Sequence, residues 1–496
     1  MISPSILWFR LDLRLEDNPA LHAAVQRGAP VIPVFIFSPG EEEPWAPGGA
    51  SRWWLHHSLA ALAGELTQVG NRLILRAGPA SIELPALARE TGANAIFWSR
   101  RYEPAIRKRD HLLAETLRQQ GIQVQEFNSA LLREPDEVRN KSGRNFQVFT
   151  PFWKACLSMP DPSPPLPHPR QVKAPPKWPR SITLDDFDLL PKHNWTARIA
   201  ETWTPGATAA AKRLRQFAQS ALASYNTGRD IPADPGTSRL SPHLHFGELS
   251  ARQVWAAIKE FSMPPTRQND LFTPTPRANR QAWRESRFLS ELGWREFSHH
   301  LLFHFPAMDH EPIRPEFKAF RWRKSPDLLQ AWQQGRTGYP LVDAGMRELW
   351  HTGWMHNRVR MVAASFLVKH LLIHWHDGAR WFWDTLVDAD LGQNSMGWQW
   401  VAGSGADAAP FFRVFNPVLQ AKRFDPDGKY IRRWIPELSK LPTPWVFEPS
   451  KAPEEILAKA GIELNKSYPQ PVVSHIIARE VALEAYARMQ QSKSPA

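Results

Sequence analysis

The chain has 496 residues, enough for two or three domains, and its 43% hydrophobic and 22% charged residues are typical of a globular protein. A net charge of +12 favours a polyanionic partner, nucleic acid before an anionic membrane, although a basic soluble enzyme has the same balance. The single cysteine, Cys156, excludes internal disulfides and Cys-rich metal sites. Early charges at Arg10 and Asp12 argue against a secretory signal, and no apolar run matches a bilayer span, so we expect a cytoplasmic protein.

Short apolar runs alternate with helical patterns over the first 130 residues. The strands are predicted at 5–10, 31–37, 72–78, 94–100 and 122–127. Helices are predicted from Asn18-Pro19 onward and at 51–68, 81–92 and 104–120. This alternation predicts an α/β domain with a parallel five-stranded, Rossmann-like sheet. No GxGxxG fingerprint follows the first strand, so nicotinamide binding by that route is not expected.

A proline-dense stretch at 158–182 indicates a connector that runs over the surface. Beyond it the pattern turns helical, with apolar periodicity over 209–226, 249–261, 288–305, 340–353 and 357–375. We therefore predict three parts: an α/β domain at 1–130, a connector at 131–205 and a mostly α-helical domain at 206–496.

Gly236–Ser241 brings hydroxyls, backbone N–H groups and one guanidinium into a short turn. Such a turn suits a phosphate or pyrophosphate, but serine-rich turns with one arginine are also common without any ligand. His243 and His245 follow closely. They suggest a metal pair, or solvated or core histidines, since no third ligand is near in the sequence.

Glu291, Trp294, Arg295 and Ser298 fall on one stripe of a predicted helix. The stripe is either the face of an amphipathic helix with a Glu–Arg pair, or a surface that stacks and hydrogen-bonds a planar ligand.

Asn357, Arg358 and Arg360 stand near aromatic residues, and Arg360 is expected to pair with Asp388. An ion pair of this kind is either structural or sets the electrostatics around a charged cofactor.

Residues 392–407, GQNSMGWQWVAGSGAD, are interpreted as a glycine-rich loop whose backbone approaches a ligand. Trp398 and Trp400 are two positions apart. In a loop they would point in different directions, one toward a cofactor and the other toward a substrate cavity.

Eight motifs, in order along nearly the whole chain, resemble the photolyase/cryptochrome family of flavoproteins. They are WFRLDLRLEDNPAL, NFQVFTPF, GTSRLSPHL, WREF, GYPLVDAGMRELW, GWMHNRVRM, LVDADLGQNSMGWQW and GADAAPFFRVFNP. The resemblance implies an N-terminal antenna domain and a helical domain that holds FAD.

The resemblance implies FAD contacts from residues of the phosphate turn and of the region around Asp388. These are Tyr225, Thr237, Ser238, Arg239, Leu240, Ser241, Phe288, Arg360, Asp388, Ala389, Asp390 and Asn394. Asn394 would face flavin N5, where plant cryptochromes resemble one another in having an Asp that can protonate the flavin. A neutral amide cannot act as that acid, so the anionic reduced form, FADH−, is favoured.

Trp398, Trp375 and Trp322 match the electron-transfer tryptophans of the family, with Trp398 nearest the flavin and Trp322 nearest solvent. Each of them alone could equally be a packing residue.

The substrate implied by the resemblance is DNA that contains a flipped-out pyrimidine dimer, bound by a monomer. Residues matching the substrate cavity are Glu291, Trp294, Asn357, Met361 and Trp400, and residues proposed for the DNA-facing rim are Arg295, Arg358, Gln399 and Arg413. By the same resemblance, enzymes that repair the (6-4) photoproduct have two histidines at the positions of Asn357 and Met361. This chain lacks these histidines, so the cyclobutane dimer is the expected substrate.

A second, antenna chromophore is expected, methenyltetrahydrofolate or a deazaflavin. The Asn-Glu pair of the folate-binding class I pattern is replaced by Ala105 and Ile106, which puts that folate site in doubt and leaves the absence of an antenna open. The motifs GMRELW and FWDTLVDAD look like those of class III-like members.

Two other functions fit part of the sequence. A cryptochrome-type blue-light photoreceptor without repair activity shares the motifs, but Asn394 and the short tail at 490–496 favour repair. A basic flavin-dependent dehydrogenase fits the composition but not the order of the motifs.

Overall fold

The computed structural model describes residues 3–262, 282–408 and 412–491. Part of the motif at 405–417, and most of the short tail, lie outside these residues. The chain forms two compact units from interleaved segments. The first consists of Met1–Trp195, Trp203–Ala223 and Ser238–Pro306, and the second of Thr196–Thr202, Ser224–Thr237 and Ala307–Ala496. The three-part division predicted from the sequence stays a prediction.

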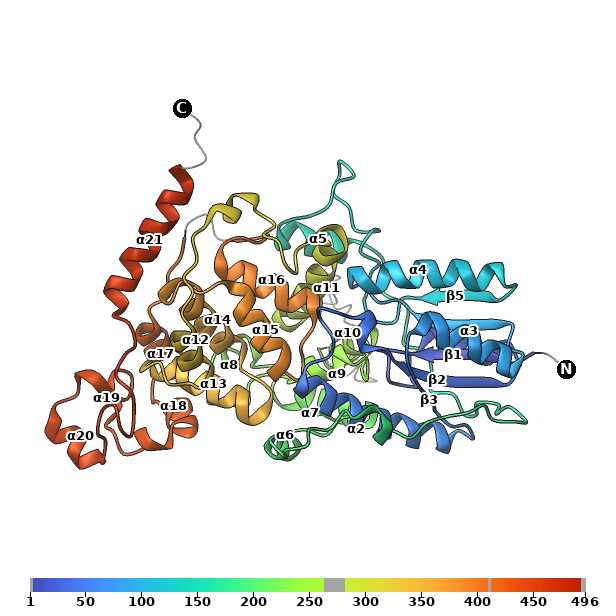
Figure 1. The fold of residues 1–496 in the computed structure, drawn as a ribbon, viewed down its shortest axis with the longest axis horizontal. Helices are drawn as coiled ribbons and strands as arrows, with labels where there is room; N and C mark the ends of the chain where they lie inside the picture. The colour runs from blue at the N-terminus through green and yellow to red at the C-terminus, as the bar shows by residue number, and fades with distance from the viewer. Residues whose placement is uncertain (1–2, 263–281, 409–411, 492–496) are drawn as a thin grey trace, which may run out of the picture. The chain divides into compact units, whose positions relative to one another are not determined.

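A five-stranded parallel sheet in the order β3-β2-β1-β4-β5 forms the core of the first unit (Figure 1). Its strands are β1 (Ser5–Phe9), β2 (Val31–Phe37), β3 (Ile74–Ala77), β4 (Ala95–Ser99) and β5 (Gln123–Phe127). Ser5 is in register with both Val31 and Ala95, so β1 is the central strand. The predicted sheet is confirmed, with strand ends shifted by one or two residues.

Alternate residues of the strands place one face of the sheet against two helices. Ile6 and Trp8 on β1 belong to one buried cluster with Leu84 and Leu87 of α3 (Ala80–Thr91) and with residues of α4 (Pro104–Gln119). Burying an aliphatic side chain such as Ile6, Leu84 or Leu87 contributes about 1.5–3 kcal/mol, so the alternating apolar residues of the strands stabilise this layer.

Helices α1 (Pro19–Gln26) and α2 (Gly49–Gln68) complete the sheet region of the first unit. Asn18 accepts a hydrogen bond from the Leu21 backbone at 3.0 Å, which is the N-cap that the Asn-Pro sequence predicts. The other helices of this unit are α5 (Phe149–Ser158), α7 (Ala207–Ser220), α9 (Ser241–His245), α10 (Ala251–Ser262) and α11 (Arg287–His304), with short 3₁₀ turns η1 (Pro39–Glu41), η2 (Asp185–Phe187) and η3 (Ala282–Glu285).

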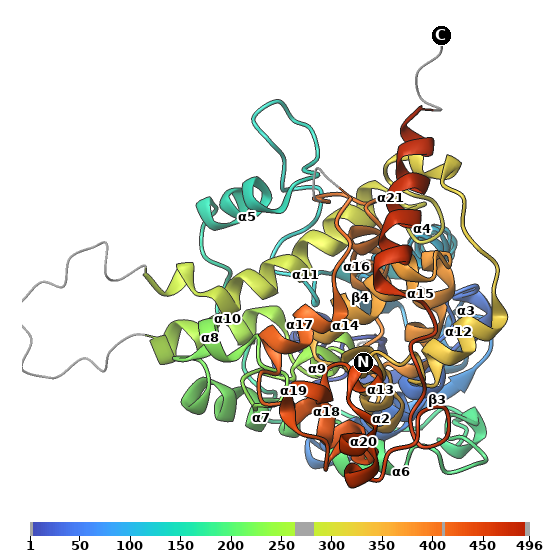
Figure 2. The same cartoon turned by 90° about the vertical axis from the view of Figure 1, so that its left-hand side faces the viewer.

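The described residues of the second unit form helices, turns and loops but no β-strand, apart from one isolated bridge between Leu464 and Tyr468. Its α-helices are α6 (Ala197–Thr202), α8 (Tyr225–Gly228), α12 (Pro326–Gln333), α13 (Pro340–Thr352), α14 (Asn357–Ser365), α15 (Trp375–Thr385), α16 (Leu391–Ala402), α17 (Pro417–Phe424), α18 (Lys429–Trp434), α19 (Thr443–Val446), α20 (Glu454–Ala460) and α21 (His475–Gln491). Its other turns are η4 (Pro315–Ala319), η6 (Pro436–Leu438) and η7 (Pro449–Lys451). Figure 2 shows α17 and α18 beside α13.

The single helix predicted over 357–375 is wrong. α14 ends at Ser365, a π-helical turn, η5 (Phe366–His370), follows, and α15 begins only at Trp375. Leu372 between them has φ 55°, a left-handed backbone conformation that no helix contains. An apolar run therefore continues through a sharp change in chain direction, which periodicity alone does not reveal.

The π-helical turn η5 carries two buried basic side chains. Nζ of Lys369 donates to the Ala402 carbonyl at 2.9 Å and lies 2.9 Å from the centre of the Phe412 ring, and burial lowers its pKa well below the ordinary value. His370 Nε2 lies 2.8 Å from Nδ1 of His475, the first residue of α21, so the two imidazoles share a hydrogen bond.

The predicted loop at 392–407 is also wrong, because residues Leu391–Ala402 form the helix α16. Asp390 caps its start by accepting from the Gln393 backbone at 2.9 Å. Gly403, with φ 88°, ends it in the left-handed conformation typical of glycine at this position. Trp398 and Trp400 thus project from a helix, about 200° apart around its axis.

No helix in the described part of the chain combines the length and apolar composition needed to cross a membrane.

Candidate functional site

Helix α16 carries three of the residues predicted to surround a flavin, spaced four apart on one face. Asp390 caps the helix, and the Asn394 side-chain amide donates to the Ala379 carbonyl of α15 at 3.0 Å. Trp398, one turn further, is 2% exposed. This hydrogen bond and the helical spacing fix an amide and an indole side by side along the contact between α15 and α16.

Arg360 of α14 connects two chain segments near that contact. Its Nη2 donates to Oδ2 of Asp388 at 2.8 Å, and its Nε donates to the Met355 carbonyl at 2.7 Å. The ion pair predicted from the sequence is therefore present. Because Asp388 is buried, the paired guanidinium offsets the cost of keeping a carboxylate away from water. Ala389 is buried between Asp388 and Asp390 in the chain.

The three predicted electron-transfer tryptophans follow one another through the second unit. Trp322 is half-buried, and the ring of His374 lies between it and Trp375. The ring centres of Trp322 and His374 are 5.1 Å apart, and those of His374 and Trp375 are 5.5 Å apart. Trp375 begins α15, and three residues later Gly378 contacts Trp398 so closely that a Cβ there would overlap the indole. The order Trp322, Trp375, Trp398 runs from a partly exposed ring to a buried one.

Trp332 was not predicted from the sequence, yet it packs edge-to-face against Trp398 with 6.1 Å between ring centres. It is fully buried and its Nε1 donates to the Ala363 carbonyl at 2.9 Å. The surrounding sequence, LLQAWQQG, contains no motif that distinguishes it from an ordinary packing residue.

The predicted phosphate turn is divided between the two units at Thr237–Ser238. In the second unit Tyr225 is buried, and Gly236 approaches Gly228 so closely that a Cβ would overlap the Gly228 carbonyl. This is a place that only glycine tolerates.

In the first unit Arg239 has φ 53° and its guanidinium carbon lies 5.8 Å from the Trp203 ring centre. Ser238 Oγ accepts from the Leu240 backbone at 3.4 Å, and Ser241 begins α9. Phe288, predicted to contact the flavin, is buried with its ring centre 4.5 Å from that of Phe217.

The predicted helical stripe is confirmed as part of α11. Trp294 stacks on Phe149 of α5 with 3.8 Å between ring centres and an angle of 10°, and Glu291 pairs with Arg287 at 3.8 Å. Phe149 was not predicted as a site residue, although it lies in the NFQVFTPF motif. The rim position predicted for Arg295 is wrong: it is 5% exposed, and its Nη1 donates to the Ala130 carbonyl at 2.7 Å.

The other predicted substrate and DNA residues lie in the second unit. Asn357 is exposed at the start of α14, and Arg413 is exposed. Arg358 pairs with Asp230 at 2.7 Å and donates to Met361 Sδ at 3.7 Å. Trp400 is half-buried and its Nε1 donates to the Asp407 carbonyl at 3.0 Å.

Gln399 does not lie on a DNA-facing rim, as was predicted. It is 0% exposed, its Nε2 donates to the carbonyls of Met308 and Glu311, and its Oε1 accepts from the Ile313 backbone. Both of its N–H donors and its carbonyl oxygen therefore hold the 308–313 segment against α16.

His243 is a core histidine. Its Nδ1 lies 2.5 Å from Oε2 of the buried Glu248, whose Oε1 accepts from Trp54 Nε1 and from the Gly206 backbone. Among residues 3–262, 282–408 and 412–491, no group of three or more His, Cys, Asp and Glu side chains could hold a metal ion.

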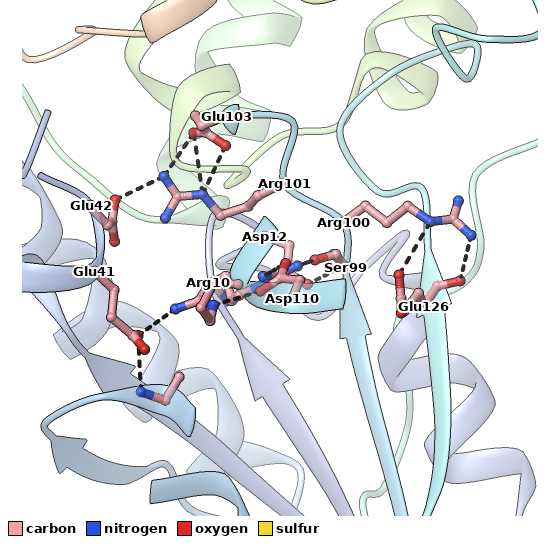
Figure 3. A network of polar contacts seen from close by, with 12 residues as sticks. Arg10, Asp12, Glu41, Glu42, Ser99, Arg100, Arg101, Glu103, Asp110 and Glu126 are labelled. Atoms are coloured by element: carbon pink, nitrogen blue, oxygen red, sulfur yellow. Dashed lines mark hydrogen bonds and ion pairs between the residues drawn. The ribbon is translucent and has the colours of Figure 1, made fainter. Parts of the chain in front are cut away.

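The carboxyl ends of β1 and β4 meet where the strand order reverses, which is where ligands bind in open α/β sheets. In Figure 3 this edge is occupied by side chains that bond to one another. Arg10 pairs with Asp110 and donates to the Ser99 carbonyl, and Ser99 Oγ donates to Asp12 at 2.6 Å. All four residues are at most 6% exposed, so this part of the edge does not fit a second chromophore.

Comparison with known proteins gives one consistent result. Residues 5–170 match the DNA photolyase family model, and residues 288–488 match the FAD binding domain of DNA photolyase. The chain is 49% identical over 491 residues to a deoxyribodipyrimidine photo-lyase of Agrobacterium fabrum, covering 99% of both chains. It is 42% identical to cryptochrome-1 of Arabidopsis thaliana, covering 98% of this chain and 70% of that one. A bacterial class III photolyase from Agrobacterium tumefaciens has a similar structure, with a TM-score of 0.92 and 49% identity over 99% of this chain and 98% of that one.

Proposed function

The chain belongs to the photolyase/cryptochrome family, and from this premise we propose that it repairs cyclobutane pyrimidine dimers in DNA in a light-driven reaction that uses FAD. The observation that carries the proposal is the contact between α15 and α16, where Asn394 and the tryptophan row meet. The two helices thereby hold a polar side chain that can contact a flavin, Asn394, next to an oxidisable indole, Trp398.

The residues around this contact suit a flavin in their chemistry. Arg360, Asp388, Asp390 and Asn394 offer both donors and acceptors, as the polar edge of an isoalloxazine ring requires. The phosphate turn adds the hydroxyls of Ser238 and Ser241 and the guanidinium of Arg239 for a pyrophosphate. FAD, when bound as FADH−, supplies the electron that splits the dimer and receives it back, so that no net redox change occurs.

Asn394 is proposed to keep the cofactor anionic. Its side-chain amide forms hydrogen bonds but has no proton to give at physiological pH, whereas an Asp at the same place could give one. The fixed hydrogen bond to Ala379 holds the amide in a single orientation, because Nδ2 is committed to the carbonyl.

The tryptophan row is proposed to deliver electrons from the protein surface to the cofactor. Indole is oxidisable, and successive aromatic rings divide a long transfer into short steps. Trp322 is the partly exposed member that an external reductant can reach, whereas Trp375 and Trp398 are buried.

Stacking and hydrogen bonding by five side chains are proposed to bind the dimer. Trp294 and Trp400 supply apolar surface, and Glu291 and Asn357 supply polar contacts for the base edges; Met361 adds a flexible thioether. Asn357 cannot act as an acid, which favours the cyclobutane dimer over the (6-4) photoproduct.

Repair is tested with the purified full-length protein, photoreduced and mixed with oligothymidylate that contains cyclobutane dimers. Under blue light we expect recovery of the thymine absorbance near its ultraviolet maximum, with a dark sample as control. Unchanged absorbance in a sample whose spectrum shows reduced FAD would exclude the repair function.

A photoreceptor function without repair is the second candidate, favoured by the 42% identity to cryptochrome-1. The two functions are separated by the Asn394→Asp variant. If repair is the function, this change should lower repair by the reduced protein and allow protonation of its flavin, seen in the visible spectrum. Absence of repair before and after the substitution would exclude the repair function.

The antenna chromophore, methenyltetrahydrofolate or a deazaflavin, remains a proposal based on the sequence. The buried network of Arg10, Asp12, Ser99 and Asp110 gives it no support at the strand ends of β1 and β4. The absorption spectrum of the protein as purified distinguishes a folate, a deazaflavin and FAD alone.

A further inference from the structure

A small cavity lies inside the first unit, among α5, α10 and α11. Its volume is about 10 Å³, which is the space that the centre of one water molecule requires. The residues that line it are Leu132, Arg133, Trp153, Cys156, Pro162, Trp255 and Glu296. None of them belongs to the proposed flavin or substrate residues, so the cavity and its contents are independent of the proposed function.

Two of the lining side chains carry buried polar atoms that have no hydrogen-bond partner among the described residues, Oε1 of Glu296 and Nε1 of Trp255. The other carboxylate oxygen, Oε2, accepts from the Leu132 and Arg133 backbone at 2.9 and 3.2 Å. The nearest guanidinium nitrogen, Nη1 of Arg295, is 3.9 Å from Oε1, too far for a hydrogen bond. Two residues that line the same small pocket thus carry one unpaired acceptor and one unpaired donor.

We propose that this cavity binds one internal water molecule, which accepts a hydrogen bond from Trp255 Nε1 and donates one to Glu296 Oε1. A buried water needs two to four polar partners and the room for one molecule, and both conditions are met here. Burying either atom without a hydrogen-bond partner costs more free energy than burying it with one. This difference favours binding of the water.

Cys156 lines the same pocket. Burial raises the pKa of its thiol to about 12, so at neutral pH the side chain is an S–H group, a weak donor, and not a competing anion. Burial also raises the pKa of Glu296. A water that donates to Oε1 stabilises the ionised carboxylate and counteracts this shift.

The water would connect elements that make no direct polar contact through these two atoms. Trp255 belongs to α10 and Glu296 to α11, while Oε2 of Glu296 holds the 132–133 segment.

A crystal structure of the full chain at a resolution that shows ordered waters is the direct test. We expect one density peak within hydrogen-bond distance of both Trp255 Nε1 and Glu296 Oε1. An empty cavity, or side chains rearranged to bond directly to each other, would overturn the proposal.

A double-mutant cycle tests it in solution. Trp255→Phe and Glu296→Gln remove the donor and the charged acceptor, and the unfolding equilibrium constant is measured for both single variants and for the double variant. If one water joins the two side chains, the double variant should be less destabilised than the sum of the single variants, by several-fold in that constant.

Trp98→Phe is the matched control. Trp98 Nε1 is also buried and without a partner among the described residues, but Trp98 does not line the cavity. Its effect should add to that of Glu296→Gln. Equal coupling for Trp98 and Trp255, or none for Trp255, would contradict the water site. If any variant fails to fold, the crystallographic result decides.

Discussion

Trp398 is a buried member of the tryptophan row, with the rings of Phe382 and Trp332 centred 5.0 and 6.1 Å from its own. Replacing it with Phe keeps an aromatic ring in this packing but removes the oxidisable indole. We expect Trp398→Phe to slow photoreduction of the flavin strongly, while repair by chemically reduced protein stays close to that of the wild type. Flavin absorbance during illumination and dimer repair are the two measurements.

Trp332→Phe is the control for this experiment, since Trp332 packs on Trp398 without standing between Trp375 and Trp398 in the proposed route. It should leave photoreduction nearly unchanged. Equal slowing in the two variants would mean that the aromatic packing, and not a particular row, governs electron transfer. Loss of repair in reduced Trp398→Phe would place Trp398 in the substrate site.

Gln399 and Arg295 show where single residues could not be predicted. Both are polar and stand beside predicted substrate tryptophans, so the sequence favours exposure. In the structure their polar groups bond to backbone carbonyls at 308, 311 and 130. Such partners come from distant segments and leave no local pattern. The Arg360–Asp388 pair could be predicted, because both residues lie in motifs of the family.

At the scale of elements, the contact between α15 and α16 depends on a glycine. A Cβ at Gly378 would overlap both the Trp398 ring and Leu367, whereas a Cβ at Gly397 would have no other atom within 4 Å. Gly378→Ala should therefore destabilise the protein by about 1–3 kcal/mol and slow photoreduction. Gly397→Ala, in the same helix as Trp398, should stabilise it by about 0.5–1 kcal/mol.

Urea unfolding and flavin photoreduction check this pair of variants. Similar effects of the two substitutions would show that helix propensity, and not the close packing at Gly378, decides the outcome. Normal photoreduction in Gly378→Ala would show that the row tolerates a displaced Trp398.

The helix α16 could have been predicted from the residues at its two ends. Asp390 and Gly403 are the N-cap and C-terminal glycine of an ordinary helix, with twelve residues between them. The glycines inside it, Gly392 and Gly397, favoured a loop because each costs helix stability. Tertiary packing of Trp398 and Gln399 outweighs that cost, and such packing is not visible in the local sequence.

α21 is held to the π-helical turn by the hydrogen bond between His370 and His475. Burial lowers the pKa of His370 to about 3, from 6.5 in the unfolded chain. The unfolded state therefore binds a proton between these values and the native state does not, so stability is lost as the pH falls through 6.5 toward 3.

His370→Phe keeps a ring against Phe366 and Tyr339 but cannot be protonated. Between pH 6.5 and 4 the wild type should lose roughly 3 kcal/mol more of its unfolding free energy than this variant. His111→Phe is the control, because His111 is 72% exposed. If both variants keep the wild-type pH dependence, another buried group is responsible.

At the scale of the whole molecule, the charge of +12 should govern binding to DNA. Each phosphate contact releases counterions, so we expect the affinity for undamaged duplex DNA to fall steeply and linearly in a plot of log affinity against log salt. Fluorescence anisotropy at several salt concentrations measures the slope. A flat dependence would mean that the basic residues serve solubility and internal ion pairs.

The parallel sheet and the helical second half could be predicted, because alternation and apolar spacing recur within short segments. The division of the chain into two units could not be predicted from the sequence. Residues 196–202 and 224–237 join the second unit although their neighbours in sequence belong to the first, and only long-range packing decides this. The phosphate turn is the clearest example, since consecutive residues Thr237 and Ser238 fall in different units.

The reactivity of the buried Lys369 amine reports local opening of the protein. The amine is sealed between the last carbonyl of α16 and the face of Phe412, so an acylating reagent in solution can reach it only when that end of the helix opens. Exposed amines such as those of Lys429 and Lys466 should be labelled at once. The delay before Lys369 reacts then measures the free energy of local opening beside the tryptophan row, in a protein that carries no added probe.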